Sequence, residues 1–170
     1  SRIDLLQLQV DGVNDDPQHA QPLNFVFDIF ANPQSLRDST SYLRQILANE
    51  KIVKVFHHCR GDASALFYQF GVYMRNVFDT ALGDCLLTFR QFNTSRSLDT
   101  VLYAWLGSDA VQLTHKGKLD FVDDMFTVRP LPLMLFEYSS EGVVYGHRLY
   151  CMQLEALQRR NIVELHASVC

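Results

Sequence analysis

The hydrophobic pattern changes its period part-way along this chain, and that change restricts the fold class more than any other feature. Two early segments, Asp4–Val10 and Asn24–Phe30, alternate in the two-residue period of β-strands. The stretch between them, Asp11 to Pro22, is rich in turn-forming and polar residues. The pattern therefore predicts a hairpin of two paired strands.

The middle of the chain alternates between helical and strand-like patterns. Apolar residues at helical spacing predict a helix over Ser35–Asn49, and a β-rich run, Lys51–Phe56, follows it. A second helix is expected over Asp62–Phe70, before a short strand at Asn76–Phe78. This order predicts strand–helix–strand units.

From Asp79 onward the pattern is helical almost throughout. Asp79 and Thr80 can cap one helix, and Ser97 can open another. Pro130-Leu131-Pro132 precedes a helical stretch that is expected to run to about His166. The prediction is an α/β fold, with a mixed sheet packed by helices on both faces and a helical C-terminal half.

The length of 170 residues and the 48% hydrophobic content are ordinary for one globular domain. Without a run of about 18 apolar residues or a secretory signal pattern, we expect no membrane association and a cytoplasmic location. Irregular spacing predicts reduced thiols, rather than a zinc site or disulfides, for Cys59, Cys85, Cys151 and Cys170.

The net charge of −4 gives no global signal for nucleic-acid binding, which depends mainly on Lys and Arg contacts to phosphates. Any RNA site on this chain must therefore be a local patch.

Two motifs carry a resemblance to a known family. Residues 57–70 follow the pattern H-x-C-R-x-D-x-x-x-L-x-x-Q-F, and residues 76–80 read N-V-F-D-T. Together they resemble the second motif of DnaQ-like, RNase D-type (DEDDy) 3′–5′ exonucleases. They are most similar to the branch that contains Egalitarian and the exonuclease 3′–5′ domain-containing proteins.

The resemblance extends over nearly the whole chain, although residues 92–126 match only loosely. The two early strands are similar to the second and third strands of the family, and Arg129-Pro130-Leu131 resembles the start of the helix with its last motif. This implies an RNase H-like exonuclease fold. Residues 1–170 would form one exonuclease-like domain in which the first strand and the first motif are missing or truncated.

The resemblance also implies how active members work. Four carboxylates hold two divalent metals that activate a water and stabilise the leaving oxygen. Two of these carboxylates come from an Asp-x-Glu that should lie upstream of the strand containing Leu5. Asp62 matches the third carboxylate, as a vestigial ligand, although local sequence alone would also allow it to be a helix N-cap.

The last motif places a tyrosine four residues before an aspartate, and here the two positions are Tyr138 and Gly142. Glycine brings no ligand, so the metal constraint is expected to be lost, with no catalytic residues and no metal bound. Glu141 is the obvious substitute, but neighbouring helical positions lie about 100° apart, which turns it away from the site.

Other chemical sites are disfavoured. His57, His58 and Cys59 are adjacent on an expected strand, where neighbours alternate faces, and no third group orients a nucleophile. The remaining histidines, His115, His147 and His166, are isolated in the sequence and are expected to be surface or satisfied residues. Cap and surface roles explain the remaining aspartates, Asp79, Asp120, Asp123 and Asp124.

Candidates for RNA contact are basic and aromatic residues near the old cleft. Tyrosine can stack on a base, and arginine can grip a phosphate with two hydrogen bonds. The first group is Lys54, His58, Arg60, Arg75 and Tyr138, and an equally eligible basic group is Arg90, Arg96, Lys116, Lys118 and Arg129. Each of them can also be an ordinary surface or packing residue.

The leading hypothesis is a catalytically inactive exonuclease-like domain that acts as an RNA-binding adaptor. The resemblance implies single-stranded RNA and RNA-processing proteins as partners, a homodimer, and a place in PIWI-interacting RNA biogenesis in the germline or in mRNA localisation, in cytoplasmic and perinuclear RNA granules. One alternative is an active exoribonuclease that uses Mg²⁺ or Mn²⁺, an upstream Asp-x-Glu and Glu141. Another is a protein–protein scaffold without RNA binding.

Overall fold

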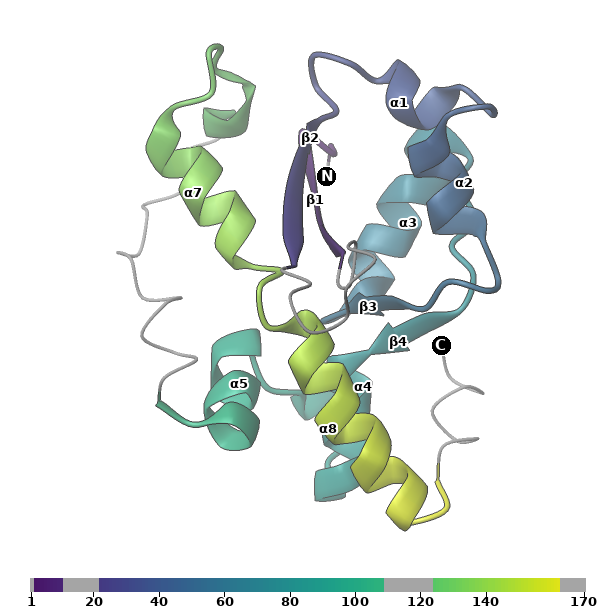
Figure 1. Cartoon of the computed structure of the whole chain (residues 1–170), viewed down its shortest axis with the longest axis vertical. Coiled ribbons are helices and arrows are strands. Elements are labelled where there is room, and N and C mark those ends of the chain that lie inside the picture. The colour runs from purple at the N-terminus through teal and green to yellow at the C-terminus, as the bar shows by residue number, and fades with distance from the viewer. Residues whose placement is uncertain (1, 11–21, 109–123, 163–170) are drawn as a thin grey trace.

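The strands of the computed structural model form two separate pairs, with helices packed around them (Figure 1). The structure describes residues 2–10, 22–108 and 124–162. In chain order the elements are β1 (Leu5–Val10), β2 (Leu23–Asp28), α1 (Gln34–Arg37), α2 (Tyr42–Ala48), β3 (Lys54–Phe56), α3 (Cys59–Phe70), β4 (Val77–Asp79), α4 (Thr80–Thr88), η1 (Phe92–Thr94), α5 (Leu98–Leu106), η2 (Met125–Thr127), α7 (Leu133–Glu141) and α8 (Gly146–Arg159).

The predicted N-terminal strand pair is confirmed. β1 and β2 run antiparallel, in a register that pairs Leu5 with Asp28 and Val10 with Leu23. Leu6 and Phe27, which face each other in this register, pack against the core. Of the predicted hairpin loop, residues 11–21 lie outside the described residues.

β3 and β4 are parallel, with Lys54 opposite Val77 and Phe56 opposite Asp79, and α3 connects them. β3 is shorter than the predicted strand over Lys51–Phe56, because the Asn49 side chain accepts a hydrogen bond from the Lys51 N–H and turns the chain. The α/β class is confirmed. Within the described residues, however, the expected mixed sheet consists of one antiparallel and one parallel two-stranded sheet.

The helix predicted over Ser35–Asn49 is divided into α1 and α2. Asp38 ends α1 in an extended conformation, and its carboxylate accepts hydrogen bonds from the backbone N–H of Thr40, at 2.8 Å, and from its hydroxyl, at 2.7 Å. Such an aspartate turn competes with the helix for backbone partners, so the helix stops there.

α3 begins at Cys59, three residues before the predicted start at Asp62. His58 precedes it with a φ of +61°, and both His58 N and Cys59 N donate to the carboxylate of Asp79, each at 3.0 Å. The N-terminus of α3 is thus capped from β4, far along the chain, and the local sequence around Asp62 carries no sign of this cap.

The predicted caps at Asp79 and Ser97 are confirmed, since each side chain accepts a backbone N–H from the helix that follows. The long helix predicted after Pro132 is interrupted. α7 ends at Glu141, a turn over residues 142–145 follows, and α8 begins at Gly146. Glycines at 142 and 146 and two β-branched valines between them disfavour a continuous helix.

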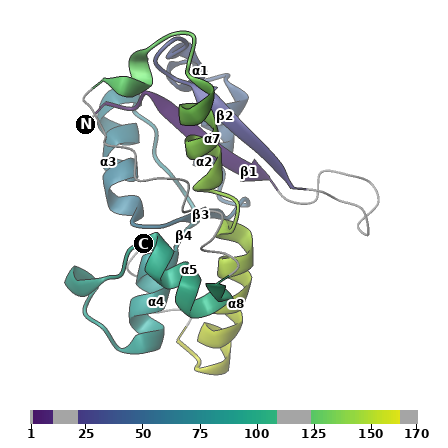
Figure 2. The same cartoon turned by 90° about the vertical axis from the view of Figure 1, so that its left-hand side faces the viewer.

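The elements gather in two groups that Figures 1 and 2 show one above the other. β1, β2, α1, α2, α3 and α7 form the upper group, around a cluster that includes Ile29, Leu36 and Leu66. α4, α5 and α8 form the lower group, around Leu102, Leu149 and Leu157. α7 packs on β1 and β2 while α8 packs on β3, so the turn between these helices spans the two sheets. No helix among the described residues is long and apolar enough to cross a bilayer.

Candidate functional site

The turn between α7 and α8 carries the last motif. Tyr138 lies on α7 and is 37% exposed, and Gly142 is the first residue after that helix. Gly142 keeps helical angles, with φ −61° and ψ −18°, and a Cβ there would meet nothing closer than the Ser139 carbonyl oxygen at 4.0 Å. The backbone could therefore carry an aspartate at position 142 without strain.

Asp62 occupies the fourth position of α3, so the N-cap interpretation of this residue is wrong. The residue is exposed, yet partial desolvation of its carboxyl group by neighbouring protein atoms raises its pKa. The nearby negative charge of Asp79 raises the pKa of Asp62 further. Unlike Asp62, Asp79 is 2% exposed and accepts three backbone N–H bonds, from His58, Cys59 and Ala81.

The described residues do not by themselves supply the ligands for a pair of divalent metal ions. Across residues 2–10, 22–108 and 124–162, no group of three or more His, Cys, Asp or Glu side chains is arranged to hold a metal. Mg²⁺ needs several hard oxygen ligands in near-octahedral geometry. Asp62 is the one carboxylate of the implied set on this chain, and Gly142 supplies none. Glu141 is the last residue of α7, half-buried.

His57 is part of a structural network rather than a nucleophilic pair. Its Nδ1 lies 2.9 Å from Thr80 Oγ1 and its Nε2 lies 3.0 Å from the Arg96 carbonyl oxygen. Because a carbonyl can only accept, Nε2 donates in this contact. Burial lowers the pKa of His57. With both ring nitrogens engaged, His57 is not placed to activate Cys59.

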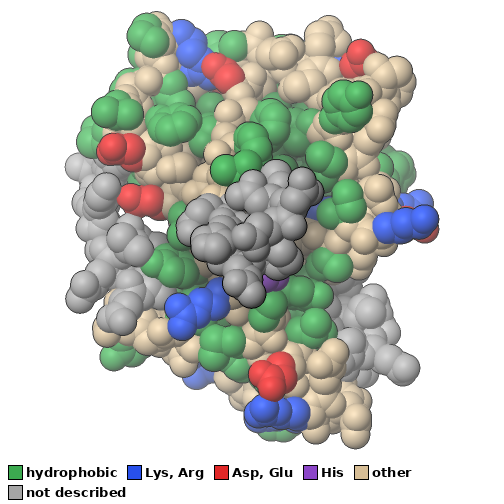
Figure 3. All heavy atoms as spheres, in the orientation of Figure 1, with side chains coloured by type: hydrophobic (Ala, Val, Ile, Leu, Met, Phe, Trp, Pro, Cys, Tyr) green, Lys and Arg blue, Asp and Glu red, His purple; other side chains and the backbone are tan. Residues whose placement is uncertain are grey.

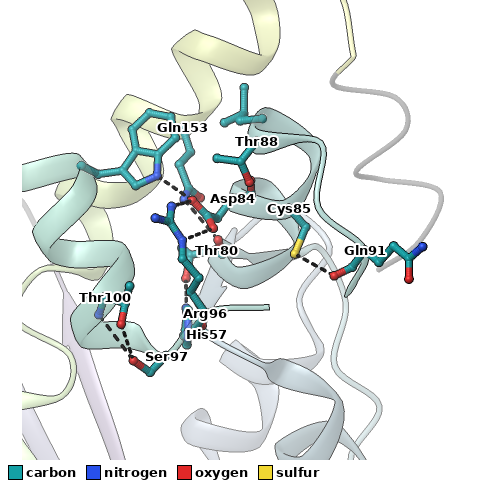
Figure 4. Close-up of polar contacts among 12 residues, drawn as sticks. His57, Thr80, Asp84, Cys85, Thr88, Gln91, Arg96, Ser97, Thr100 and Gln153 are labelled. Carbon is teal, nitrogen blue, oxygen red and sulfur yellow. Dashed lines mark hydrogen bonds and ion pairs between the residues drawn. The ribbon is translucent and has the colours of Figure 1, made fainter. Parts of the chain in front are cut away.

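A buried ion pair joins α4 to the segment before α5, and the sequence analysis missed it (Figure 4). Asp84 is fully buried and receives two hydrogen bonds from the Arg96 guanidinium, one of them from Nε at 2.9 Å. Trp105 Nε1 donates a third bond to Asp84, at 3.0 Å. The sequence signal for this ion pair was a single aspartate, Asp84, among the apolar residues of a predicted helix.

This ion pair corrects the prediction that Arg96 is available for RNA. Arg129 is also engaged, since its guanidinium binds both carboxylate oxygens of Asp28 and the carbonyls of Phe126 and Val128. The hydrogen bond from Arg129 holds the pKa of Asp28 below its usual range. Neither guanidinium is free to grip a phosphate.

Lys54 is likewise excluded as an RNA contact, because it is 4% exposed and its Nζ donates to the carbonyls of Asn49 and Ile52. His58 and Arg60 remain together at the amino end of α3, exposed. Arg75 is exposed as well, but it precedes the amino end of β4, whereas His58 follows the carboxyl end of the parallel strand β3. The structure thus separates Arg75 from the other two.

The second basic group is dispersed. Besides the engaged Arg96 and Arg129, Arg90 is exposed just after α4, and Lys116 and Lys118 lie outside the described residues. Figure 3 shows Lys and Arg in small separate groups on the visible face, with hydrophobic side chains between them and no large basic patch.

The remaining sequence candidates have structural roles or are not described. His147 Nε2 contacts Cys151 Sγ at 3.4 Å, and Asp124 pairs with Arg2 at 2.9 Å. Within the described part of the chain, no disulfide joins Cys59, Cys85 and Cys151. His115, His166, Asp120, Asp123 and Cys170 lie outside the described residues.

Comparison with known sequences gives a consistent result. A family described as 3′-5′ exonuclease matches residues 24–156. The Egalitarian protein homolog of Caenorhabditis elegans is 40% identical over 70 residues, which cover 41% of this chain and 12% of that protein. The piRNA biogenesis protein EXD1 of Bombyx mori is 30% identical over 129 residues, 74% of this chain and 39% of that protein. The chain therefore spans well under half of these relatives.

Solved structures agree on the fold. Brucella melitensis NrnC superposes with a TM-score of 0.70 at 18% identity, covering 98% of this chain and 80% of that one. Trypanosoma brucei RNase D in complex with RNA U12 gives a TM-score of 0.62 at 20% identity, with 88% and 54% of the two chains covered. At these identities the similarity concerns the fold alone.

Proposed function

Because the chain belongs to the 3′–5′ exonuclease family, we propose that it binds single-stranded RNA without cutting it and serves as an adaptor in an RNA-processing complex. The observation that carries the proposal is Gly142. A carboxylate would fit there, since a Cβ on this residue would lie 4.0 Å from its nearest neighbour, the Ser139 carbonyl oxygen, yet glycine offers no ligand. Two-metal hydrolysis needs each of its carboxylates.

The names of the relatives support a role with RNA. One relative is a piRNA biogenesis protein, and one structural neighbour was solved with RNA bound. The similarity to the Egalitarian homolog and to EXD1 supports a place in germline PIWI-interacting RNA biogenesis or mRNA localisation. In that role the protein would be found in the cytoplasm, at perinuclear RNA granules, where imaging of the tagged protein in germ cells can test it.

The proposed function is tested by incubating the purified protein, with any segment that precedes residue 1, with end-labelled single-stranded RNA in EDTA, Mg²⁺ or Mn²⁺. We expect intact RNA in a complex that does not need metal and that weakens steeply as salt rises, because phosphate contacts release counterions. RNA that shortens only with metal would disprove the adaptor proposal.

The alternative function, an active exonuclease, predicts a different result in the same assay. The matching family is described as 3′-5′ exonuclease, so an active nuclease is the second candidate function. If Glu141 replaces the lost ligand, metal-dependent shortening will appear and Glu141→Gln will abolish it. Glu137→Gln, one turn earlier on α7 and exposed, is the matched control and should leave any shortening unchanged.

The scaffold alternative is favoured by apolar side chains that α7 exposes. Leu133 is 70% exposed, Met134 59% and Phe136 45%. A homodimer or a partner protein could cover them. Light scattering at low and high salt separates the alternatives: a dimer insensitive to salt that does not bind RNA would support the scaffold and contradict the adaptor.

A further inference from the structure

A groove on the outer face of α3 combines aromatic rings with a hydrophobic floor. It is open, has a volume of about 300 Å³, and is lined by Cys59, Ala63, Ser64, Phe67, Tyr68, Val72, Tyr73, Met74 and Val77. The volume is at the lower end of the range for ligand pockets, about 300–1,000 Å³. The lining includes no acidic side chain.

Three rings form a connected set along this groove. The Phe67 ring lies 5.1 Å from the Tyr68 ring and 4.6 Å from the Tyr73 ring, measured between centroids. The two tyrosines are 83% and 62% exposed, so most of each ring remains available to a ligand. Contact with Phe67 restricts their motion, which reduces the entropy lost when a planar group stacks on them.

Arginines lie near both ends of the groove. Arg60 shares a helix face with Ser64 and Phe67, one and two turns away, while Asp62 lies about 140° around the helix from Phe67. Arg75 follows the groove residue Met74 at the other end. Both are exposed, and neither guanidinium has a hydrogen-bond or ion-pair partner among the described residues, unlike Arg44, Arg96 and Arg129.

We propose that this groove is a binding track for single-stranded RNA, in which bases stack on Tyr68 and Tyr73 and phosphates contact Arg60 and Arg75. Single strands are usually held by aromatic platforms combined with basic groups. α3 has 12 residues and is about 18 Å long, so the two arginines can reach different phosphates of one strand. The lining of the track includes none of residues 138–142, and the inference rests on the proposed RNA binding.

A second hollow fits this chemistry less well. It has a volume of about 380 Å³ and its lining includes Arg96, Trp105 and Arg160. Arg96 and Trp105 already bind Asp84, and Arg160 donates to the Leu87 carbonyl. Its polar groups are used within the protein, so it offers little to RNA.

The test measures the affinity of the protein for a fluorescent 12-nucleotide oligouridylate in EDTA. Tyr68→Ala/Tyr73→Ala should weaken binding at least about 30-fold, because each stacked base contributes a factor of about 5 or more. The matched control is Tyr42→Ala/Tyr103→Ala, since these tyrosines are 83% and 62% exposed on α2 and α5. It should bind as the unchanged protein does.

Two further double variants identify which contacts bind the RNA, ring stacking or phosphate pairing. Tyr68→Phe/Tyr73→Phe keeps the rings and should keep the affinity, whereas loss there would contradict stacking. Arg60→Ala/Arg75→Ala should reduce the slope of log affinity against log salt by about 1.4, at about 0.7 per phosphate contact. Arg148→Ala/Arg159→Ala, exposed positions on α8, should leave the slope unchanged. Thermal unfolding of each variant checks that it is folded.

The outcomes separate this inference from the function on which it rests. If the unchanged protein binds RNA and the alanine variants of the groove bind equally well, the track is wrong and the adaptor proposal stands. Equal losses in the groove and control variants would also overturn the track. If the unchanged protein binds no RNA, both proposals fail and a peptide becomes the alternative occupant.

Discussion

Asp79 caps the amino ends of two helices, α3 and α4. One buried carboxylate accepts the N–H groups of His58 and Cys59 at the start of α3, and that of Ala81 at the start of α4. A helix start leaves its first N–H groups without partners, and here one side chain serves two helices. Capping of these two helices therefore explains why an aspartate stands at position 79 of the N-V-F-D-T motif, and no metal is needed for this explanation.

This dual cap predicts a large cost for Asp79→Ala. The variant should lower the free energy of unfolding by about 3 kcal/mol, because three donors lose a charged acceptor. Asp79→Asn keeps one acceptor oxygen and should cost about half as much. Urea unfolding followed by circular dichroism measures both. Equal stability of the alanine variant and the unchanged protein would refute the dual cap.

His57 predicts how stability depends on pH. Burial lowers its pKa in the folded state below the ordinary value of 6.5, so the unfolded chain binds the proton more readily. The stabilisation is therefore complete above about pH 6.5 and is lost as pH falls toward the folded-state pKa. One histidine can contribute at most about 1.4 kcal/mol per pH unit.

The measurement is the urea midpoint between pH 7.5 and 5.5. His57→Gln, whose amide can still meet Thr80 and the Arg96 carbonyl, should flatten this dependence. His147→Gln, which changes an exposed histidine on α8, is the matched control. The same slope in all three proteins would show that other groups cause the pH dependence.

At the scale of elements, the Asp84–Arg96 pair fixes α5 against α4 (Figure 4). Trp105 on α5 donates a hydrogen bond to the same carboxylate. Asp84→Ala should cost about 3–5 kcal/mol, because it leaves a guanidinium without its buried partner. Arg96→Ala should cost a similar amount.

The double variant tests whether the two residues act as a unit. Removing both partners leaves no unpaired charge, so Asp84→Ala/Arg96→Ala should cost about 1–3 kcal/mol less than the sum of the single changes. Equilibrium unfolding supplies the values. Trp105→Phe removes only one hydrogen bond and should cost about 1 kcal/mol. Additive costs for Asp84 and Arg96 would mean that the pair is not coupled.

For the whole molecule, separate sheets and separate core clusters imply uneven stability. An isolated two-stranded sheet is marginal, and on β2 Leu23 and Phe25 are each more than 40% exposed. α4 and α8 pack together through buried residues such as Leu87 and Leu157. We predict that β1–β2 amides exchange with deuterium well before those of α4 and α8, as measured by NMR. Uniform exchange would contradict this.

The sequence predicted much of the local structure. Alternating residues indicated β1 and β2, and Asp79 and Ser97 were recognised as caps because the cap and its helix are neighbours in the chain. The motifs over residues 57–80 indicated the exonuclease family, which the family match confirms. The identity of Gly142, and hence the lost ligand behind the proposed function, was also available from the sequence.

Contacts between distant residues could not be predicted in this way. The start of α3 depends on Asp79, 20 residues after Cys59. Arg96 and Arg129 were RNA candidates until folding brought the carboxylates of Asp84 and Asp28 to them. Local patterns fix which backbone groups pair within one element, because those partners are close in sequence. The partner of a charged side chain depends on which elements pack together, and only the tertiary structure determines that.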